Sequence, residues 1–182
     1  MILLVDQDGC LSDIEEGFLA NWKKMYPDEF HIPLEQRTTH MIIDQYPFEL
    51  RQKVKSVYHA HGFFLELKPI PGAVQALNEM MSMDLDVRIC TSPLHHYENC
   101  LVEKYNWVQR YFGFEYTKRI VITQDKTLIR GNYLIDDNPH VSGIYPPEWE
   151  HIVFDAPYNK KSNQRRLIWS DWKYVLDIQS SS

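Results

Sequence analysis

The sequence predicts an α/β fold in which a mostly parallel sheet is flanked by helices and a small helical segment is inserted after the first strand. Short apolar runs alternate with helical patterns along the chain, which is typical of βαβ units. The first run, residues 2–5, is continuously apolar, as expected for a buried central strand. Between residues 14 and 68 only helical patterns occur, which indicates an insertion rather than more sheet.

The remaining elements follow in chain order. Further apolar runs predict strands at residues 86–90, 119–122, 133–135 and 152–154. Apolar side chains at i, i+3 and i+4 spacing predict helices at residues 72–81 and 97–111. Near the end of the chain, residues 165–169 and 172–176 are expected to be helical segments that cover the sheet.

The inserted segment has its own apolar pattern. Phe18, Leu19, Trp22 and Met25 share one face of a predicted helix, and residues 48–58 give another. Pro69 and the pair Pro71-Gly72 are breaker residues suited to its exit. We therefore predict an α/β core at residues 1–13 and 69–179, a helical cap segment at residues 14–68 and a frayed tail at residues 180–182.

Composition excludes several classes of partner. The net charge of −6 argues against a long nucleic acid, because such binding rests on many phosphate-neutralising lysines and arginines. No apolar run approaches the ~20 residues that span a bilayer, so no membrane partner is expected. The start of the sequence has no basic leader and the three cysteines have no metal-site spacing, which together predict the cytoplasm. A homodimer is compatible with the sequence, which does not determine the oligomeric state.

The strongest local signal is Asp6-Gln7-Asp8-Gly9, directly after the first strand. In open α/β sheets, ligands bind beyond the carboxyl ends of the strands, so Asp6 and Asp8 are expected at the functional edge. Gly9 allows a sharp curl of the chain. An ordinary strand-ending turn is the alternative for this motif taken alone.

Polar residues also follow the next two predicted strands. Thr91 and Ser92 offer a hydroxyl and a backbone amide for a phosphate oxygen, although a serine or threonine in this place is also a common helix cap. Lys126 could neutralise a transferring phosphoryl group, whereas in isolation it would be a solvated surface lysine.

Asp136 and Asp137 follow the predicted strand at residues 133–135. Two adjacent acids repel each other unless a cation lies between them and the first acids, although Asp-Asp-Asn-Pro also suits a turn. Taken together, the four strand-end signals predict an oxygen cage for Mg²⁺ beside a hydroxyl, a lysine and a spare carboxylate. These groups are the equipment for phosphoryl transfer.

The same ordered residues resemble the four motifs of the haloacid dehalogenase (HAD) superfamily of phosphatases. Within it the chain is most similar to the 5′(3′)-deoxyribonucleotidases, through residues 62–73, 89–93, 103–108, 122–127, 134–137 and 149–152. The resemblance runs over nearly the whole chain and is weakest in the cap segment. It implies a Rossmann-like HAD core with a small helical cap. It also implies hydrolysis of deoxyribonucleoside 5′(3′)-monophosphates.

The resemblance also implies a role for each motif residue. Asp6 would be the nucleophile that forms an aspartyl-phosphate, and Asp8 would be the general acid and then the general base. Asp6, Asp137 and the backbone carbonyl of Asp8 would bind Mg²⁺, with Asp136 supporting them. The phosphate oxygens would be held by Thr91, Ser92 and Lys126.

The cap segment departs from the animal members of the family, in which aromatic residues line the base pocket. Ile14, His40 and Met41 stand at the corresponding positions, which leaves base preference open. His40 could contact a base or face solvent. Gln124 replaces an expected basic residue, and Lys104 is either an extra charge near the phosphate or a helix-surface lysine.

Two other functions share part of this pattern. A HAD phosphatase acting on another small phosphorylated metabolite would differ only in the cap segment. A receiver-like signalling module also assembles acids, a hydroxyl and a lysine, but it carries its acidic pair on the first strand and has no helical insertion. The present chain has the reverse order, which favours the phosphatase.

Overall fold

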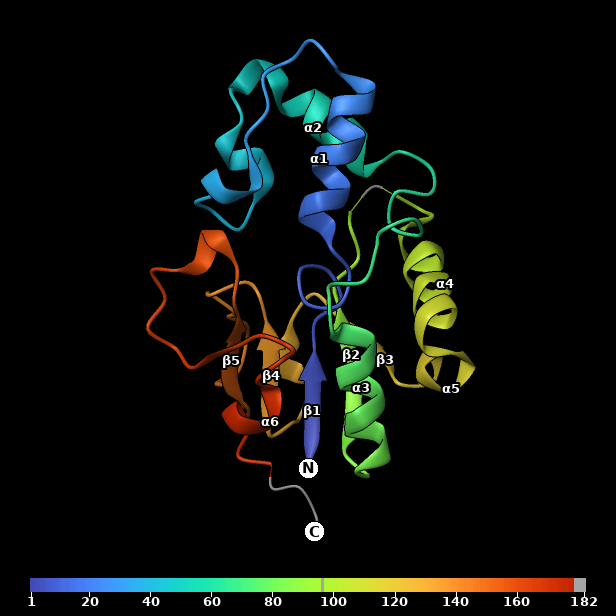
Figure 1. Ribbon diagram of the computed structural model, residues 1–182, viewed down its shortest axis with the longest axis vertical. Coiled ribbons are helices and arrows are strands. Elements are labelled where there is room, and N and C mark those ends of the chain that lie inside the picture. Colours follow the sequence, from blue (N-terminus) through green and yellow to red (C-terminus); the bar gives the residue numbers. More distant parts are fainter. Residues whose placement is uncertain (96, 179–182) are drawn as a thin grey trace.

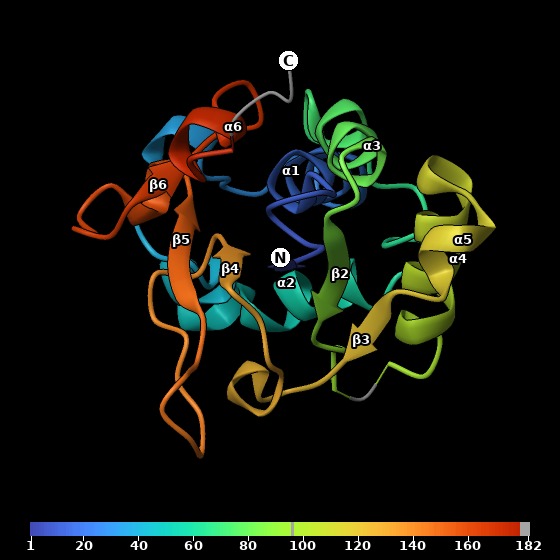
Figure 2. The same ribbon diagram turned by 90° about the horizontal axis from the view of Figure 1, so that it is seen from below.

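Six parallel strands form one sheet in the part of the chain that the computed structural model describes, residues 1–95 and 97–178. Their spatial order is β3-β2-β1-β4-β5-β6, which can be followed across the sheet in Figure 2. The strands are β1 (Ile2–Val5), β2 (Asp86–Thr91), β3 (Ile120–Ile122), β4 (Tyr133–Asp136), β5 (Glu150–Phe154) and β6 (Arg166–Leu167). The predicted tail at residues 180–182, like residue 179, lies outside the described residues.

Helices alternate with these strands, which confirms the predicted α/β class. They are α1 (Ile14–Met25), α2 (Arg51–Tyr58), α3 (Ala73–Ser82), α4 (Cys100–Phe112), α5 (Phe114–Thr117) and α6 (Trp172–Val175). Short 3-10 turns complete the chain: η1 (Leu34–Gln36), η2 (Ile42–Gln45), η3 (Phe48–Leu50), η4 (Lys126–Leu128) and η5 (Pro157–Asn159). None of the helices within residues 1–95 and 97–178 combines the length and apolar character needed to cross a bilayer.

Alternation along the central strand divides the core between the two faces of the sheet. Leu3 and Val5 of β1 belong to the larger apolar cluster, to which the helices α3, α4 and α6 contribute buried side chains. Leu4 points to the other face and packs with Cys90, Leu134 and Trp149. Because successive strand residues face opposite ways, the apolar run of β1 is buried on both sides.

The cap segment lies beyond the end of β1 at which the strand arrow points (Figure 1). Asp13 begins α1 by accepting a hydrogen bond from the Glu16 amide at 2.9 Å, as an N-cap residue does. Phe18 and Trp22 are buried against Tyr46, with ring centroids 5.9 and 4.8 Å away. These aromatic side chains belong to the same apolar cluster as Leu3 and Val5 of β1, so the cap segment packs onto the core of the sheet.

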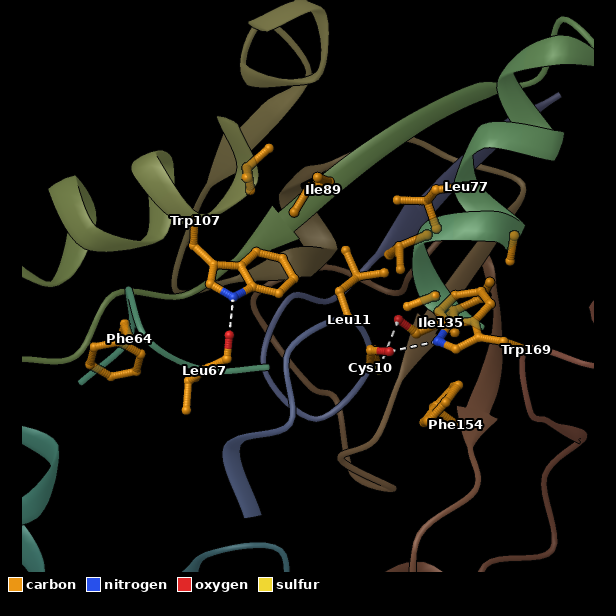
Figure 3. Packing of buried hydrophobic residues seen from close by; sticks show 14 of the residues in the cluster. Cys10, Leu11, Phe64, Leu67, Leu77, Ile89, Trp107, Ile135, Phe154 and Trp169 are labelled. Atoms are coloured by element: carbon orange, nitrogen blue, oxygen red, sulfur yellow. Dashed lines mark hydrogen bonds between the residues drawn. The ribbon is translucent and has the colours of Figure 1, made fainter. Parts of the chain in front are cut away.

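The two ends of the cap segment lie side by side. The Asp13 amide donates to the Lys68 carbonyl, and the Ile70 amide donates to the Leu11 carbonyl, both at 2.8 Å. Two tryptophans bond to the chain on either side of this junction (Figure 3). Trp107 donates to the Leu67 carbonyl, and Trp169 donates to the Cys10 carbonyl, both at 2.7 Å. These bonds fix the loop after β1 against the core.

The helical prediction for residues 165–169 was wrong. The edge strand β6 pairs there with β5, in a register that places Val153 beside Arg166 and Phe154 beside Leu167. Leu167 and Trp169 are buried while Ile168 is 44% exposed, which is the two-residue period of a strand. The short apolar run was assigned the wrong period.

Candidate active site

The acids and the lysine predicted from the strand ends meet at one edge of the sheet. Asp6 follows β1, Asp136 ends the neighbouring strand β4, and Asp137 comes next. Lys126 opens η4, shortly after β3. Together they line a cavity of about 300 Å³ at the carboxyl ends of the strands, where ligands of open α/β sheets bind.

Lys126 is a bridge between two carboxylates and not a surface side chain. It is 7% exposed, and its Nζ lies 2.7 Å from Asp6 Oδ1 and 2.5 Å from Asp136 Oδ2. Burial acts to lower the pKa of Lys126, but Asp6 and Asp136 outweigh it and hold that pKa well above its usual value. The ammonium group is therefore a fixed positive charge in the lining of the cavity.

Asp6, Asp136 and Asp137 form the candidate cation site. One oxygen of each lies within 4.8 Å of the others. Burial, opposed by Lys126 and reinforced by Asp136 and Asp137, raises the pKa of Asp6 to about 7. Among the described residues, Asp137 Oδ1 is buried without a hydrogen-bond partner. The site thus holds more negative charge and more lone pairs than its protein neighbours satisfy.

Gly9 closes the loop directly over these acids. Its φ of +80° is left-handed, and a Cβ built on it would lie 2.4 Å from Asp137 Oδ2. Such a contact is far inside van der Waals range, so only glycine lets the backbone approach this carboxylate. Gly9 of the Asp6-Gln7-Asp8-Gly9 motif is therefore needed for the turn and also for the close approach of the loop to Asp137.

Asp8 lies two positions after Asp6 in the loop and pairs with a different lysine. Lys104 Nζ lies 2.7 Å from Asp8 Oδ2, and the Ser12 hydroxyl donates to Asp8 Oδ1 at 2.8 Å. Lys104 comes from α4 and is 4% exposed, so the helix-surface alternative for this lysine was wrong. Both Asp8 and Lys104 line the cavity.

The two residues that follow Cys90 lie at different depths. Ser92 lines the cavity and donates its hydroxyl to the Thr123 carbonyl at 2.8 Å. It does not cap α4, which begins only at Cys100. Thr91 is 1% exposed, is not among the described residues that line this cavity, and accepts a hydrogen bond from Lys104 at 2.9 Å.

The cap residues are divided in the same way. Ile14 and His40 line the cavity, whereas Met41 is 54% exposed and is not among its described lining residues. His40 Nε2 lies 3.5 Å from Asp137 Oδ2, so the solvent-facing alternative for His40 was wrong. Burial opposes the charged form of His40, but the Asp137 carboxylate outweighs burial and raises the His40 pKa.

Sequence reasoning missed the segment after β5. Tyr158 is buried and donates its hydroxyl to Asp137 Oδ2, and Asn159 Nδ2 donates to the Asp137 carbonyl at 2.9 Å. A signal was present, because residues 157–159 follow a predicted parallel strand and so belong to the same sheet edge as the acids.

Comparison with known proteins decides the family. A family described as "5′ nucleotidase, deoxy (Pyrimidine), cytosolic type C protein" matches residues 1–180. The chain belongs to this family.

Its relatives are similar over nearly their full lengths. A Bordetella pertussis protein named as a candidate 5′(3′)-deoxyribonucleotidase is 46% identical over 97% of this chain and 95% of its own. The human 5′(3′)-deoxyribonucleotidase of cytosolic type is 45% identical over 96% of this chain and 92% of its own. The human mitochondrial enzyme is 43% identical over 96% and 82%.

Solved structures of other proteins have the same fold as this chain. A haloacid dehalogenase-like protein from Agrobacterium tumefaciens matches with a TM-score of 0.62 and 15% identity over 97% of both chains. A HAD family hydrolase from Deinococcus radiodurans, crystallised with phosphate and sodium, matches with a TM-score of 0.59 and 12% identity over 96% and 94%. The core of the chain is therefore the Rossmann-like sheet of HAD hydrolases.

Proposed function

We propose that this chain hydrolyses deoxyribonucleoside 5′(3′)-monophosphates with Mg²⁺, through an aspartyl-phosphate on Asp6. Membership of the nucleotidase family makes the chain a phosphatase, and the substrate, cation and intermediate are the proposal. The observation that carries it is the meeting of Asp6, Lys126 and the pair Asp136–Asp137 at one cavity.

The donor set fits a hard divalent cation. Mg²⁺ prefers oxygen ligands, and Asp6, Asp136 and Asp137 bring carboxylate oxygens within 4.8 Å of one another. The buried Asp137 Oδ1, unpartnered among the described residues, fits a role as a ligand. We assign Asp6, Asp137 and the Asp8 carbonyl as ligands, with Asp136 in support. A bound Mg²⁺ would supply positive charge against the phosphate oxygens.

Asp6 is assigned as the nucleophile because it lines the cavity beside Lys126. An Asp6 oxygen forms a bond to phosphorus while the bond from phosphorus to the nucleoside oxygen breaks. Asp8 gives that oxygen a proton, then takes one from the water that attacks the phosphorus and frees Asp6. A single residue, Gln7, separates Asp6 from Asp8 in the sequence, and both acid side chains line the same cavity.

The lysines and the second motif are assigned to the phosphate. Lys126 and Lys104 both line the cavity and offset the charge of a phosphate dianion, which otherwise repels a carboxylate nucleophile. Ser92 lines the cavity and can contact a phosphate oxygen. The Thr91 hydroxyl is engaged by Lys104, so we assign Thr91 to orienting that lysine.

A second candidate substrate class is favoured by four polar residues that line the cavity. His40, Gln124, His140 and Ser142 line it, and these groups offer hydrogen bonds rather than an aromatic stacking surface. A polar wall suits another small phosphorylated metabolite as well as a nucleoside. The catalytic assignment is the same for both classes.

The test is inorganic phosphate release from a substrate panel, with Mg²⁺ and with EDTA. The panel contains dUMP, dTMP, dGMP, dAMP, UMP, a 3′-deoxynucleotide and several sugar phosphates. Mg²⁺-dependent turnover that favours deoxynucleotides is the expected result. Turnover confined to sugar phosphates would keep the Asp6 mechanism and replace the substrate, whereas full activity in EDTA would contradict the cation.

A cytoplasmic location is supported by the human relative of cytosolic type, and fractionation of the source cells tests it. The proposed partner is a small nucleotide. A homodimer remains a prediction, which the molar mass in solution would decide.

A further inference from the structure

Tyr158 and Asn159, in the segment after β5, each donate a hydrogen bond to Asp137. The Tyr158 hydroxyl donates to Asp137 Oδ2. Asn159 Nδ2 donates to the Asp137 backbone carbonyl at 2.9 Å and to the Phe154 carbonyl at 2.8 Å. A side-chain bond and a backbone bond from consecutive residues restrict both the position and the rotation of this carboxylate.

These two hydrogen bonds leave one carboxylate oxygen of Asp137 without a hydrogen-bond partner among the described residues. Oδ2 carries the bond from Tyr158, while the buried Oδ1 has no protein partner among the described residues. The loop at Gly9 lies so close to the same carboxylate that a Cβ there would clash with it.

The ring of Tyr158 faces the cap segment. The Arg37 guanidinium lies 5.7 Å from the ring centroid, and the His40 ring lies edge-on at 5.9 Å. Arg37 is buried and donates through Nε to Glu15 of α1 at 2.7 Å and through Nη1 to Gln45. Tyr158 therefore joins the core acid to the buried polar network of the cap segment.

We propose that Tyr158 is a positioning residue for the cation site: its hydroxyl orients Asp137 so that one oxygen stays free for the metal, and its ring is held by Arg37 and His40. The inference rests on the proposed function, because it concerns the cation assigned there. Partners of metal ligands typically change metal affinity by about 10–100-fold when removed.

The test is Mg²⁺ titration by calorimetry, without substrate, of wild type and Tyr158→Phe. The variant keeps the ring and its packing and removes only the hydroxyl. Mg²⁺ affinity should fall about tenfold, at the lower end of the usual range for such partners. In phosphate release, the Mg²⁺ concentration for half-maximal rate should rise by a similar factor, and the rate at saturating Mg²⁺ should fall less.

Tyr116→Phe is the matched control. Tyr116 is 4% exposed and donates its hydroxyl to the Leu77 carbonyl at 2.6 Å, within the core and away from the acids. Both variants lose one buried hydrogen bond, so both should lose some thermal stability. Only Tyr158→Phe should lose Mg²⁺ affinity.

The outcomes separate the two proposals. If wild type binds Mg²⁺ and Tyr158→Phe binds it equally well, Tyr158 is merely structural and the inference is wrong, while the proposed function stands. Equal losses of affinity in Tyr158→Phe and Tyr116→Phe would also overturn it, because the effect would then follow from stability. Failure of wild type to bind Mg²⁺ would overturn the cation assignment and the inference together.

Discussion

Lys104 Nζ lies 2.7 Å from Asp8 Oδ2, which joins helix α4 to the loop after β1 inside the cavity. The same ammonium donates to the Thr91 hydroxyl at 2.9 Å and to the Ser92 carbonyl at 2.7 Å. The residue before it, Glu103, accepts from the Gly62 amide at 2.8 Å at the far end of the cap segment. Two consecutive residues of α4 therefore contact Asp8, the pair Thr91-Ser92 and the end of the cap segment at Gly62.

Lys104→Met should lower phosphate release about 100-fold, the usual effect of removing one donor that stabilises developing negative charge. The reason is that Lys104 orients Asp8 and faces the cavity. Steady-state kinetics at saturating Mg²⁺ measures the effect. Lys118→Met, which removes an exposed lysine paired with Glu115, should leave the rate unchanged. A Lys104→Met rate equal to wild type would show that this lysine is only structural.

Asp6→Asn should lower turnover by about 10³-fold or more, as removal of a nucleophile does, while the protein stays folded. Lys126 keeps its bond to Asp136 at 2.5 Å, so the buried ammonium is not left unpaired. Phosphate release and thermal unfolding measured side by side check both parts. The exposed Asp44→Asn serves as control. Parent-rate turnover by Asp6→Asn would refute the mechanism.

Gly9→Ala should weaken Mg²⁺ binding, because its Cβ would lie 2.4 Å from Asp137 Oδ2 and displace that carboxylate. The φ of +80° adds a backbone cost of about 1–2 kcal/mol in the free energy of unfolding. Gly113→Ala is the matched control, since Gly113 has φ +87° and its Cβ would meet no described atom within 4 Å. Calorimetry and urea unfolding of both variants separate the clash from the strain.

His151 should lower the free energy of unfolding as the pH drops below about 6.5, whereas the raised pKa values of Asp6 and His40 act in the opposite direction. Burial lowers the His151 pKa from 6.5, so below that pH the unfolded chain takes up a proton that the folded chain resists. The contribution of neutral His151 to the free energy of unfolding is complete above pH 6.5. It decreases as the pH falls from 6.5 toward the lower pKa of His151 in the folded protein.

Urea unfolding between pH 8 and pH 5.5 checks this dependence. Relative to wild type, the free energy of unfolding of His151→Gln should fall less, or rise more, as the pH drops, and the exposed His61→Gln should keep the wild-type slope. Identical slopes in wild type and His151→Gln would contradict the assignment to His151.

Strand-end motifs were predictable because parallel strands bring distant residues to one edge. Asp6, Lys126 and Asp136 follow apolar runs in the sequence, and any parallel arrangement of those runs gathers their side chains. The edge strand β6 was not predictable in the same way. Its two residues carry too short a period to separate strand from helix without a neighbouring strand.

Side chains that reach the site from elsewhere carried no comparable signal. Lys104 sits on a helix whose local pattern is equally that of a surface lysine, and only the packing of α4 buries it against Asp8. Tyr158 lies 21 residues beyond Asp137, and its hydroxyl finds that carboxylate because β5 pairs with β4. Whether His40 faces solvent or Asp137 depends on how the cap segment rests on the core.

The sequence by itself determined the α/β class, the order of the chemical groups and the edge at which they meet, because strand periodicity and residue type are local properties. The tertiary structure decided which of those groups are buried, which carboxylate oxygen is left unpaired, and which distant residues hold it. Burial and hydrogen bonding depend on contacts between elements far apart in the chain, which local patterns do not encode.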